Sequence, residues 1–220
     1  MHKEMILRLT KYYRILHKLK ALGLERVFAN NLGDAIGVKG AVVRKDFTIL
    51  KISGQKRGGY NISSLISELN TILGKDKPQR AVVVGCGRIG GALMRYSGFA
   101  MDGIHLTAGF DINPSVCDDD QCPIPIYPME KLESFIKEED IRVAIIAVNE
   151  QASTEVFNQL KEAGIKGILN FSPIELRITR THERPPVIIR NVNIALELEH
   201  IFYEINIAEN SLISEEDLIQ

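Results

Sequence analysis

The fold is decided by AVVVGCGRIGGALMRY, residues 81–96 of the 220-residue chain. The first four residues form a short apolar run that predicts a buried strand, and the last six predict a helix. Between them stands the G-x-G-x-x-G pattern of Gly85, Gly87 and Gly90. The first glycine permits a sharp turn, the second lets the backbone approach a pyrophosphate, and the third lets the helix pack against the sheet. The stretch predicts a dinucleotide site in which phosphates lie at a helix N-terminus.

A second apolar run, 104–110, ends in Asp111. A carboxylate at this place can accept hydrogen bonds from the ribose hydroxyls of NAD(H), and it repels the additional phosphate of NADP(H). The spacing from Gly85 is somewhat longer than the roughly 20 residues usual for this pair, and turns at 97–99 and 101–103 account for the difference. The alternative is a glycine-rich turn in an α/β domain that binds no nucleotide.

Charge is divided unevenly along the chain. Residues 1–76 carry 14 Lys and Arg against 6 Asp and Glu, a formal +8, whereas residues 77–220 carry 13 against 22, a formal −9. Together they give the net −1 of the whole chain. A basic part joined to an acidic part indicates contact with nucleic acid through the basic part.

The basic part has the order of helices found in a winged helix. Residues 4–22 predict a helix with an apolar stripe of Ile6, Leu9, Tyr13, Leu16, Leu19 and Leu22. Residues 30–36, with an Asn cap, and residues 39–50 predict two short helices around Gly37. Two such helices, the second of them basic, indicate a helix-turn-helix.

A glycine-rich basic loop, 53–60, follows and suits the tip of a hairpin. Asn61 then caps a predicted helix over 62–73, and 74–78 form a linker. For each basic residue the alternatives are a solvated helix face or an ordinary polar turn, but the charge of the whole part favours DNA contact. The candidates from this region are Arg44, Lys45, Lys51, Lys56 and Arg57.

Strands and helices alternate after the glycine pattern. Further strands are predicted at 124–127, 143–148, 167–170 and 187–192. Helices are predicted at 129–137 and 154–163. This alternation predicts a doubly wound parallel sheet, in which ligands bind beyond the carboxyl ends of the strands. Those ends are Gly85, Asp111, Asn149 and 170–173.

The last predicted helix, 193–207, is strongly apolar and requires cover from its own domain or from a second subunit. Residues 212–218 match the core of a common epitope tag, so the tail is set aside. The predicted organisation is a DNA-binding domain, a Rossmann domain, a C-terminal helix and a tail, at 1–78, 79–192, 193–208 and 209–220.

Three cysteines, Cys86, Cys117 and Cys122, lack the spacing of a zinc site or a disulfide framework, and we expect no metal. No apolar run approaches the roughly 18 residues of a membrane span, and the N-terminus lacks the apolar core of a signal peptide. The sequence therefore predicts a cytoplasmic protein.

Seven groups of residues occur together in an order that resembles the Rex family of redox-sensing transcriptional repressors. They are 8–9 with 12–14, 43–47, 57–61, the glycine pattern with 96–99, 110–114, 163–173 and 190–192. The resemblance covers the chain to about residue 207. It implies a homodimer of winged-helix and Rossmann domains whose C-terminal helix is swapped into the partner. It also implies that the protein binds operator DNA and represses transcription when NAD+ is abundant, and that it leaves the DNA when NADH binds. Because the dimer is twofold symmetric, the operator is expected to be palindromic.

The sequence patterns and the resemblance together give the expected site residues. The dinucleotide set is Gly85, Cys86, Gly87, Arg88, Ile89, Gly90, Tyr96, Asp111, Ile112, Asn149, Asn170, Phe171 and Ser172. The resemblance adds a switch between Arg14, which also belongs to the DNA-binding set, Tyr96 and an acid on the swapped helix. That acid is replaced by Asn193 in this chain.

Three positions depart from the family pattern. Asn193 and Asn113 stand where the family has Asp, and Asn149 stands where it often has Pro. Asn193 can accept a hydrogen bond but carries no charge, and neutral hydrogen bonds are weaker than those to charged groups. The sequence therefore predicts a less steep response to NADH than in relatives with Asp.

An NAD-dependent oxidoreductase with a basic accessory domain is the alternative from another functional class. Such an enzyme requires a proton donor or acceptor beside the nicotinamide, and it requires a second lobe for the substrate. The sheet domain leaves no room for that second lobe. His105, His182 and His200 lack an acid partner in sequence, so we expect no enzyme. A third alternative keeps the fold but binds another nucleotide, such as a coenzyme A derivative, or no ligand.

Overall fold

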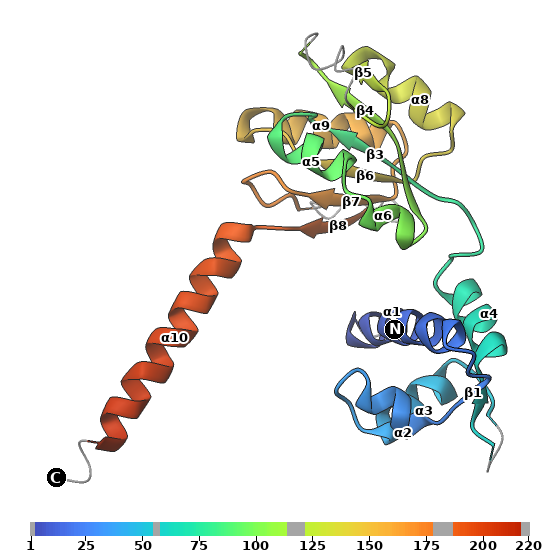
Figure 1. The fold of residues 1–220 in the computed structure, drawn as a ribbon. Helices are drawn as coiled ribbons and strands as arrows, with labels where there is room; N and C mark the ends of the chain where they lie inside the picture. The colour runs from blue at the N-terminus through green and yellow to red at the C-terminus, as the bar shows by residue number, and fades with distance from the viewer. Residues whose placement is uncertain (1–2, 55–57, 114–121, 178–186, 217–220) are drawn as a thin grey trace. The chain divides into compact units, whose positions relative to one another are not determined.

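The computed structural model describes residues 3–54, 58–113, 122–177 and 187–216. The chain folds into two compact units, Met1–Gln79 and Arg80–Gln220, shown in Figure 1. The boundary falls directly after the expected linker at 74–78. The α/β class, with an N-terminal helical unit followed by a Rossmann-type sheet, is confirmed.

The first unit is mostly helical. Its elements are α1 (Lys3–Ala21), β1 (Arg26–Val27), α2 (Ala29–Asp34), α3 (Gly40–Ile49), β2 (Tyr60–Asn61) and α4 (Ile62–Ile72). Helix α1 packs against α4, and α2 packs against α3. The core buries Leu9, Tyr12 and Leu16 of α1 with Val43 and Phe47 of α3. The rings of Tyr12 and Phe47 meet edge to face at 5.5 Å, a favoured aromatic geometry.

Two local predictions for this unit are wrong. The buried aromatic residue of α1 is Tyr12 rather than Tyr13, and Leu22 is 76% exposed. Helix α2 begins at Ala29, and its N-cap residue makes no side-chain capping bond, so Asn30 is not the cap. The Asn61 cap of α4 is confirmed, because the side chain of Asn61 accepts a hydrogen bond from Ser64 N at 2.9 Å.

The strand that follows the basic loop pairs with a strand that lies far from it in the sequence. β2 pairs antiparallel with β1, with Val27 opposite Tyr60. Gly59, which precedes β2, has φ of +67° and lies against Val27 O, so only glycine fits there without strain. Lys56 and Arg57 of the loop lie outside the described residues.

The second unit is built on a six-stranded sheet of order β5-β4-β3-β6-β7-β8. The strands are β3 (Gln79–Val84), β4 (Ile104–Asp111), β5 (Ile126–Pro128), β6 (Val143–Ile146), β7 (Gly167–Asn170) and β8 (Ile188–Asn191). The pairs β3 with β6, β4 with β5, β6 with β7 and β7 with β8 are parallel. Strand order reverses between β3 and β6, which is where sheets of this kind bind ligands.

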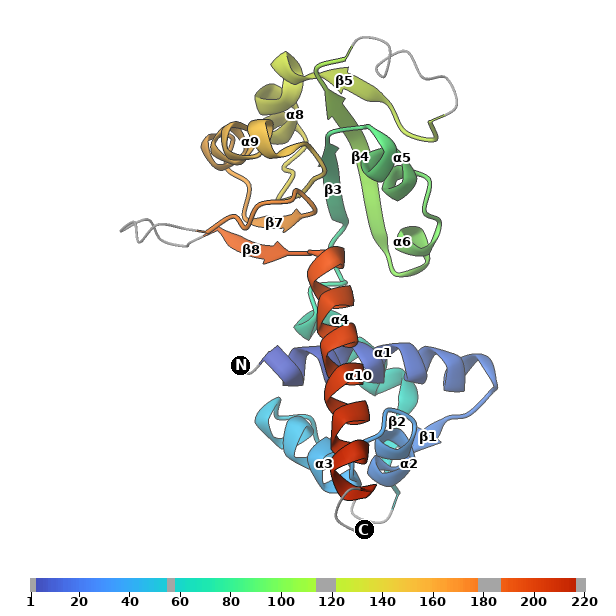
Figure 2. The ribbon, with the colours of Figure 1, turned by 90° about the vertical axis from the view of Figure 1, so that its left-hand side faces the viewer.

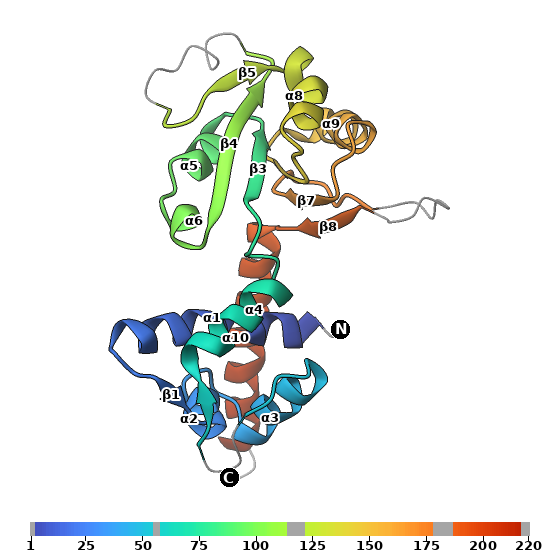
Figure 3. The ribbon, with the colours of Figure 1, turned by 90° about the vertical axis from the view of Figure 1, so that its right-hand side faces the viewer.

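Helices cover both faces of this sheet. They are α5 (Arg88–Met94), α6 (Gly98–Met101), α8 (Leu132–Glu138, after the 3-10 turn η1, Met129–Lys131) and α9 (Glu150–Glu162). Figures 2 and 3 show α5 and α6 on one face and α8 and α9 on the other. Alternate residues of β3 face opposite sides, as strand geometry requires. Val82 and Val84 pack with α8 and α9, while Val83 packs with Met94 of α5.

The two largest differences from the sequence-based helix boundaries are at the start of α9 and the end of α10. Helix α9 begins at Glu150 instead of residue 154, because the side chain of Asn149 caps it and accepts from Ala152 N at 3.1 Å. Helix α10 (Ile194–Glu216) runs past residue 207 into the tail that the sequence analysis sets aside. The end of the helix near 207 was therefore wrong.

Helix α10 carries large apolar side chains that remain exposed. Ile201 is 52% exposed and Phe202 is 70% exposed. Large contiguous patches of exposed apolar side chains are typical of interaction surfaces. None of the described helices combines the length and the apolar character that a membrane span requires.

Candidate dinucleotide site and DNA-binding face

The glycine turn after β3 has no room for side chains at two positions. Gly85 has φ of +91°, and a Cβ there would lie 2.6 Å from Ala147 O. A Cβ on Gly90 would lie 1.8 Å from Gly85 O. Gly87 is the N-cap residue of α5 and makes no side-chain capping bond. The turn therefore brings bare backbone close to the end of β6, as a phosphate loop requires.

Asp111 is tied to this turn. Its Oδ2 accepts a hydrogen bond from Cys86 N at 2.7 Å, and its Oδ1 accepts one from Asn113 N at 2.8 Å. The carboxylate therefore fixes the end of β4 against the glycine turn, a role that the sequence analysis missed. The ribose contact of Asp111 stays a prediction.

A pocket of about 310 Å³ opens where the strand order reverses. Five residues expected to bind the dinucleotide line it: Gly85, Gly87, Asp111, Ile112 and Asn149. The other lining residues are Val84, Phe110, Met129, Ala147, Val148, Ala152 and Val156. The pocket is thus a mostly apolar cleft with a carboxylate and bare backbone at its mouth, which suits an adenosine and its phosphates.

A second hollow of about 510 Å³ shares Ile112, Met129, Ala152 and Val156 with this pocket. Its lining includes Glu130, Glu133, Glu155 and Glu162. These carboxylates make the surroundings of the pocket acidic. An additional phosphate on the ribose would meet like charge here.

The remaining expected residues of the glycine pattern lie around the pocket rather than in its lining. Arg88 and Ile89 are exposed on the first turn of α5, and Gly90 is buried. Cys86 is 7% exposed, and its thiol donates to Phe110 O at 3.5 Å. This burial makes Cys86 a packing residue whose backbone, rather than its sulfur, takes part in the turn.

The expected residues at the end of β7 turn inward. Asn170 is fully buried and Ser172 is 5% exposed. Asn170 Oδ1 accepts from Ser172 N at 3.0 Å and from Ser172 Oγ at 2.6 Å. Phe171 packs in part against the apolar cluster of Val83. The contacts that these three residues make with a dinucleotide stay predictions.

Helix α3 has one basic exposed face and one buried face. Arg44 and Lys45 are exposed, while Val43, Asp46 and Phe47 are buried. Arg44 donates to Asn30 Oδ1 at 3.2 Å, which joins it to α2. Arg14 on α1 and Lys51, just after α3, are also exposed.

Beneath α3 lies a charged cluster, which we define as Arg8, Tyr12 and Asp46. Asp46 is 2% exposed and accepts two bonds from Arg8, at 2.7 and 2.8 Å, and one from Tyr12 Oη at 3.0 Å. Burial and then the bond to Asp46 raise the pKa of Tyr12 above its ordinary value. The bond to Asp46 also raises the pKa of Arg8. The sequence analysis missed this cluster, although Arg8 and Tyr12 share a helix face at a spacing of four residues.

The expected switch residues lie in both units. Arg14 belongs to the first unit, and Tyr96 and Asn193 belong to the second. Tyr96 is 60% exposed and meets Phe99 edge to face at 5.1 Å. Asn193 caps α10, because its Oδ1 accepts from Leu196 N at 3.1 Å.

Comparison with known proteins agrees with this arrangement. A family model described as a CoA binding domain matches residues 76–174, and one described as a putative DNA-binding protein N-terminus matches residues 3–48. The redox-sensing transcriptional repressor Rex of Clostridioides difficile is 35% identical over 90% of this chain and 92% of that protein. Rex of Lactobacillus gasseri is 33% identical over 89% of each.

The chain belongs to the Rex family. Solved structures place it there as well. The repressor RSP in complex with β-NAD+ and operator DNA is 30% identical, with a TM-score of 0.86, covering 98% of this chain and 96% of that one. RSP in complex with β-NADH is 29% identical, with a TM-score of 0.77, covering 98% of each. Membership of the Rex family confirms the resemblance on which the expected site was based.

Proposed function

We propose that the chain is a DNA-binding transcriptional repressor that senses the balance of NADH and NAD+. The observation that carries the proposal is the pocket at the reversal of strand order, lined by Gly85, Gly87, Asp111, Ile112 and Asn149, in a chain whose other unit exposes a basic helix. The complexes of RSP with β-NAD+ and operator DNA, and with β-NADH, support it. NAD+ or no ligand leaves the protein on DNA, and NADH releases it.

Operator contacts follow from the first unit. Arg44 and Lys45 of α3 enter the major groove, while Lys56 and Arg57 reach phosphate or the minor groove. Arg14 and Lys51 complete the set of DNA-binding residues. The protein acts in the cytoplasm. As a homodimer it has twofold symmetry, so its operator is a palindromic site. The exposed apolar face of α10 supports the homodimer, with the helix of one subunit covering or entering the other.

The domain limits that we propose are 1–78, 79–192 and 193–208, with 209–220 as a tail. Residues 209–216 of the tail continue α10. Catalysis is not part of the proposal. Among the described residues that line the dinucleotide pocket, Asp111 is the only one with a titratable side chain, and both its oxygens accept backbone N–H groups. An oxidoreductase needs a positioned acid or base beside the nicotinamide.

A second candidate is a regulator of the same fold with another nucleotide ligand. The family model that matches residues 76–174 is described as a CoA binding domain, and Asn193, Asn113 and Asn149 depart from the Rex pattern. Coenzyme A and NAD(H) share an adenosine and a diphosphate, which the pocket suits, but coenzyme A carries an additional phosphate on its ribose that would meet the carboxylates beside the pocket. Titration of the protein with coenzyme A and with NADH distinguishes the two candidate functions.

The test is retention of a palindromic operator by the purified protein during titration with NAD+, NADH, NADPH and coenzyme A. We expect NADH alone to release DNA, NAD+ to leave it bound, and NADPH to bind far more weakly than NADH. Turnover of NADH by a small substrate would support the oxidoreductase instead. Release by coenzyme A and not by NADH would support the second candidate.

A further inference from the structure

The loop after β7 is fastened to the last strand by a pair of side-chain amides. Asn170 of β7 and Asn191 of β8 lie opposite each other in the parallel register. Nδ2 of Asn170 donates to Oδ1 of Asn191 at 2.8 Å and also to Ile174 O at 2.7 Å. With the two bonds accepted from Ser172, both protons and the oxygen of the Asn170 amide are in use.

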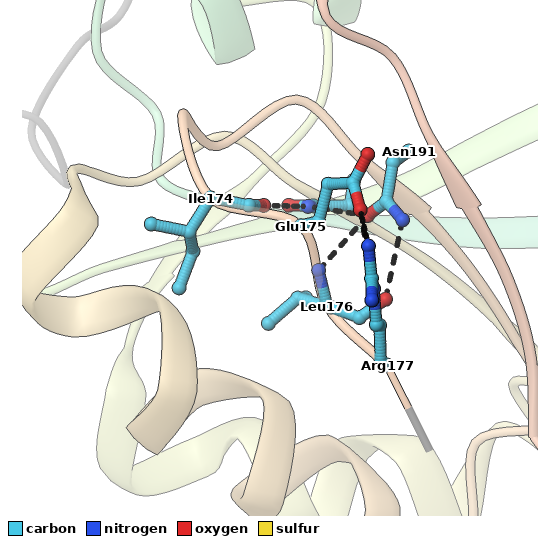
Figure 4. Close-up of polar contacts among 6 residues, drawn as sticks. Ile174, Glu175, Leu176, Arg177 and Asn191 are labelled. Atoms are coloured by element: carbon cyan, nitrogen blue, oxygen red, sulfur yellow. Dashed lines mark hydrogen bonds and ion pairs between the residues drawn. The ribbon is translucent and has the colours of Figure 1, made fainter. Parts of the chain in front are cut away.

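Asn191 extends these bonds along the loop, as Figure 4 shows. Its Oδ1 accepts from Leu176 N at 3.1 Å, and its Nδ2 donates to Leu176 O at 3.2 Å. The donors of Asn170 and Leu176 both require an acceptor here, so the amide of Asn191 has one orientation. Leu176 is itself buried in the core of the sheet. The segment 172–176 is therefore held between the core and Asn191.

The backbone that follows Asn191 enters α10. Asn193, two residues later, caps that helix. The residue between them, Val192, donates its N–H to Asn170 O at 2.8 Å. The amide cluster, defined as Asn170, Ser172 and Asn191, thus touches the loop after β7 at one end and the start of α10 at the other.

We propose that Asn191 is a positioning residue of the redox response, which sets the loop 172–176 relative to the start of α10. The inference rests on the proposed function, together with the expectation from the sequence that NADH contacts Phe171 and Ser172 and that Asn193 is a switch residue. A dinucleotide that moves Ser172 must either carry Asn170, and with it Asn191, or break hydrogen bonds within the amide cluster. Either event changes the hydrogen bonds that hold the residues before Asn193, the cap of α10. The protein then has two arrangements with different affinities for the ligand, as any ligand response requires.

The test uses the full-length protein and two substitutions of graded effect. Asn191→Asp keeps an acceptor for Asn170 and for Leu176 N but loses the donor to Leu176 O, and Asn191→Leu loses all three bonds. Ile136→Val, at a buried residue of α8, serves as the control for a general loss of stability. For each protein we would measure NADH affinity and operator affinity with and without saturating NADH.

We expect all variants to bind operator without ligand within about twofold of the parent. The fall in operator affinity caused by saturating NADH should shrink by about threefold for Asn191→Asp and about tenfold for Asn191→Leu, because each lost hydrogen bond removes part of the coupling. Ile136→Val should respond as the parent does. Since operator affinities are compared at saturation, a weaker NADH affinity alone does not produce this result.

Two results would overturn the inference in distinguishable ways. A parent protein that keeps its operator affinity in saturating NADH removes the proposed function and the inference with it. A parent that responds, with both Asn191 variants responding equally well, leaves the function in place and removes the role of Asn191. Should Asn191→Leu fail to fold, Asn191→Asp decides the matter alone.

Discussion

Each of the two units contains a cluster of polar side chains bonded to a buried residue, Asp46 in the first and Asn170 in the second, and the clusters differ in kind. In the charged cluster of the first unit, the buried carboxylate of Asp46 accepts two hydrogen bonds from Arg8 and one from the hydroxyl of Tyr12. The amide cluster of the second unit is neutral. Asn170 is fully buried in it, but Asn191 lies exposed on the outermost strand, β8.

This difference matches the different tasks of the two clusters. Hydrogen bonds to charged groups contribute about 1.5–3 kcal/mol each, and neutral ones contribute about 0.5–1.5 kcal/mol. Breaking a buried ion pair also leaves an uncompensated charge. The charged cluster therefore holds α3 in one position on α1. The amide cluster can exchange its weaker bonds at the surface, which suits a segment that responds to a ligand.

The largest expected effect comes from removing the carboxylate of the charged cluster. Asp46→Ala leaves Arg8 charged and without its bidentate partner, which should lower the free energy of unfolding by about 3–5 kcal/mol. Operator binding should be lost with it, as chemical denaturation and gel retention would show. Asp34→Ala, at an exposed acid on α2, is the control and should stay within about 0.5 kcal/mol. A loss below about 1 kcal/mol for Asp46→Ala would contradict the role of this cluster.

Removing the hydroxyl of Tyr12 should cost less. Tyr12→Phe deletes one bond to a charged acceptor, worth about 1.5–3 kcal/mol. The pKa of Tyr12 in the folded protein lies above its ordinary value of 10.0. Its contribution to stability is therefore full below pH 10 and is lost as the pH rises above it.

The measurement is urea denaturation of parent and Tyr12→Phe between pH 7 and 11. The gap in unfolding free energy between them should narrow above pH 10. Tyr13→Phe is the matched control, since Tyr13 packs against His17 rather than bonding to Asp46. A gap that stays constant with pH would mean that the hydroxyl of Tyr12 does not titrate as proposed.

Two neighbouring glycines test the phosphate loop. A Cβ on Gly90 would lie 1.8 Å from backbone Gly85 O, whereas a Cβ on Gly91 meets first the far end of the Arg95 side chain at 3.0 Å. Gly90→Ala should displace the turn at a cost of about 1–3 kcal/mol and lose NADH binding. Gly91→Ala should keep NADH binding and gain helix stability. Equal NADH affinity in both variants, measured by calorimetry, would place the dinucleotide elsewhere.

The smallest expected effect concerns the missing charge at Asn193. Asn193→Asp keeps the cap on α10, because Asp and Asn cap helices equally well. It adds a charge that strengthens hydrogen bonds by about 1 kcal/mol, so the fall in operator affinity with NADH should steepen by about fivefold. Asn193→Ser keeps a cap without charge and should behave as the parent. An unchanged response in Asn193→Asp would show that charge at this position does not drive release.

Sequence reasoning was strongest where the signal is local. The glycine turn, Asp111 at the end of β4 and the strand 167–170 follow from short patterns in which each residue type has one geometric reason. The Asn61 cap is of the same kind. These features set the fold class and the pocket.

What the sequence did not predict depends on partners far along the chain. Tyr12 is chosen over Tyr13 as the buried residue because α3 and α4 pack on that face of α1 and Asp46 bonds its hydroxyl. The bond between Asn170 and Asn191 requires the parallel register of β7 and β8. The pairing of β2 with β1, rather than with a strand beside it in sequence, is also a long-range choice. Periodicity along one segment holds no information about such pairings.

The central claim is that a dinucleotide is sensed at the strand ends and acts through the amide cluster, while the charged cluster keeps α3 fixed. Amide hydrogen exchange of the full-length protein, with and without saturating NADH, tests it most directly. We expect NADH to change the protection of Cys86 N, Ser172 N and Leu176 N, which bond to Asp111, Asn170 and Asn191. The amides of α3 should exchange at the same rate in both states. Altered exchange in α3 with no change at Ser172 and Leu176 would contradict the account.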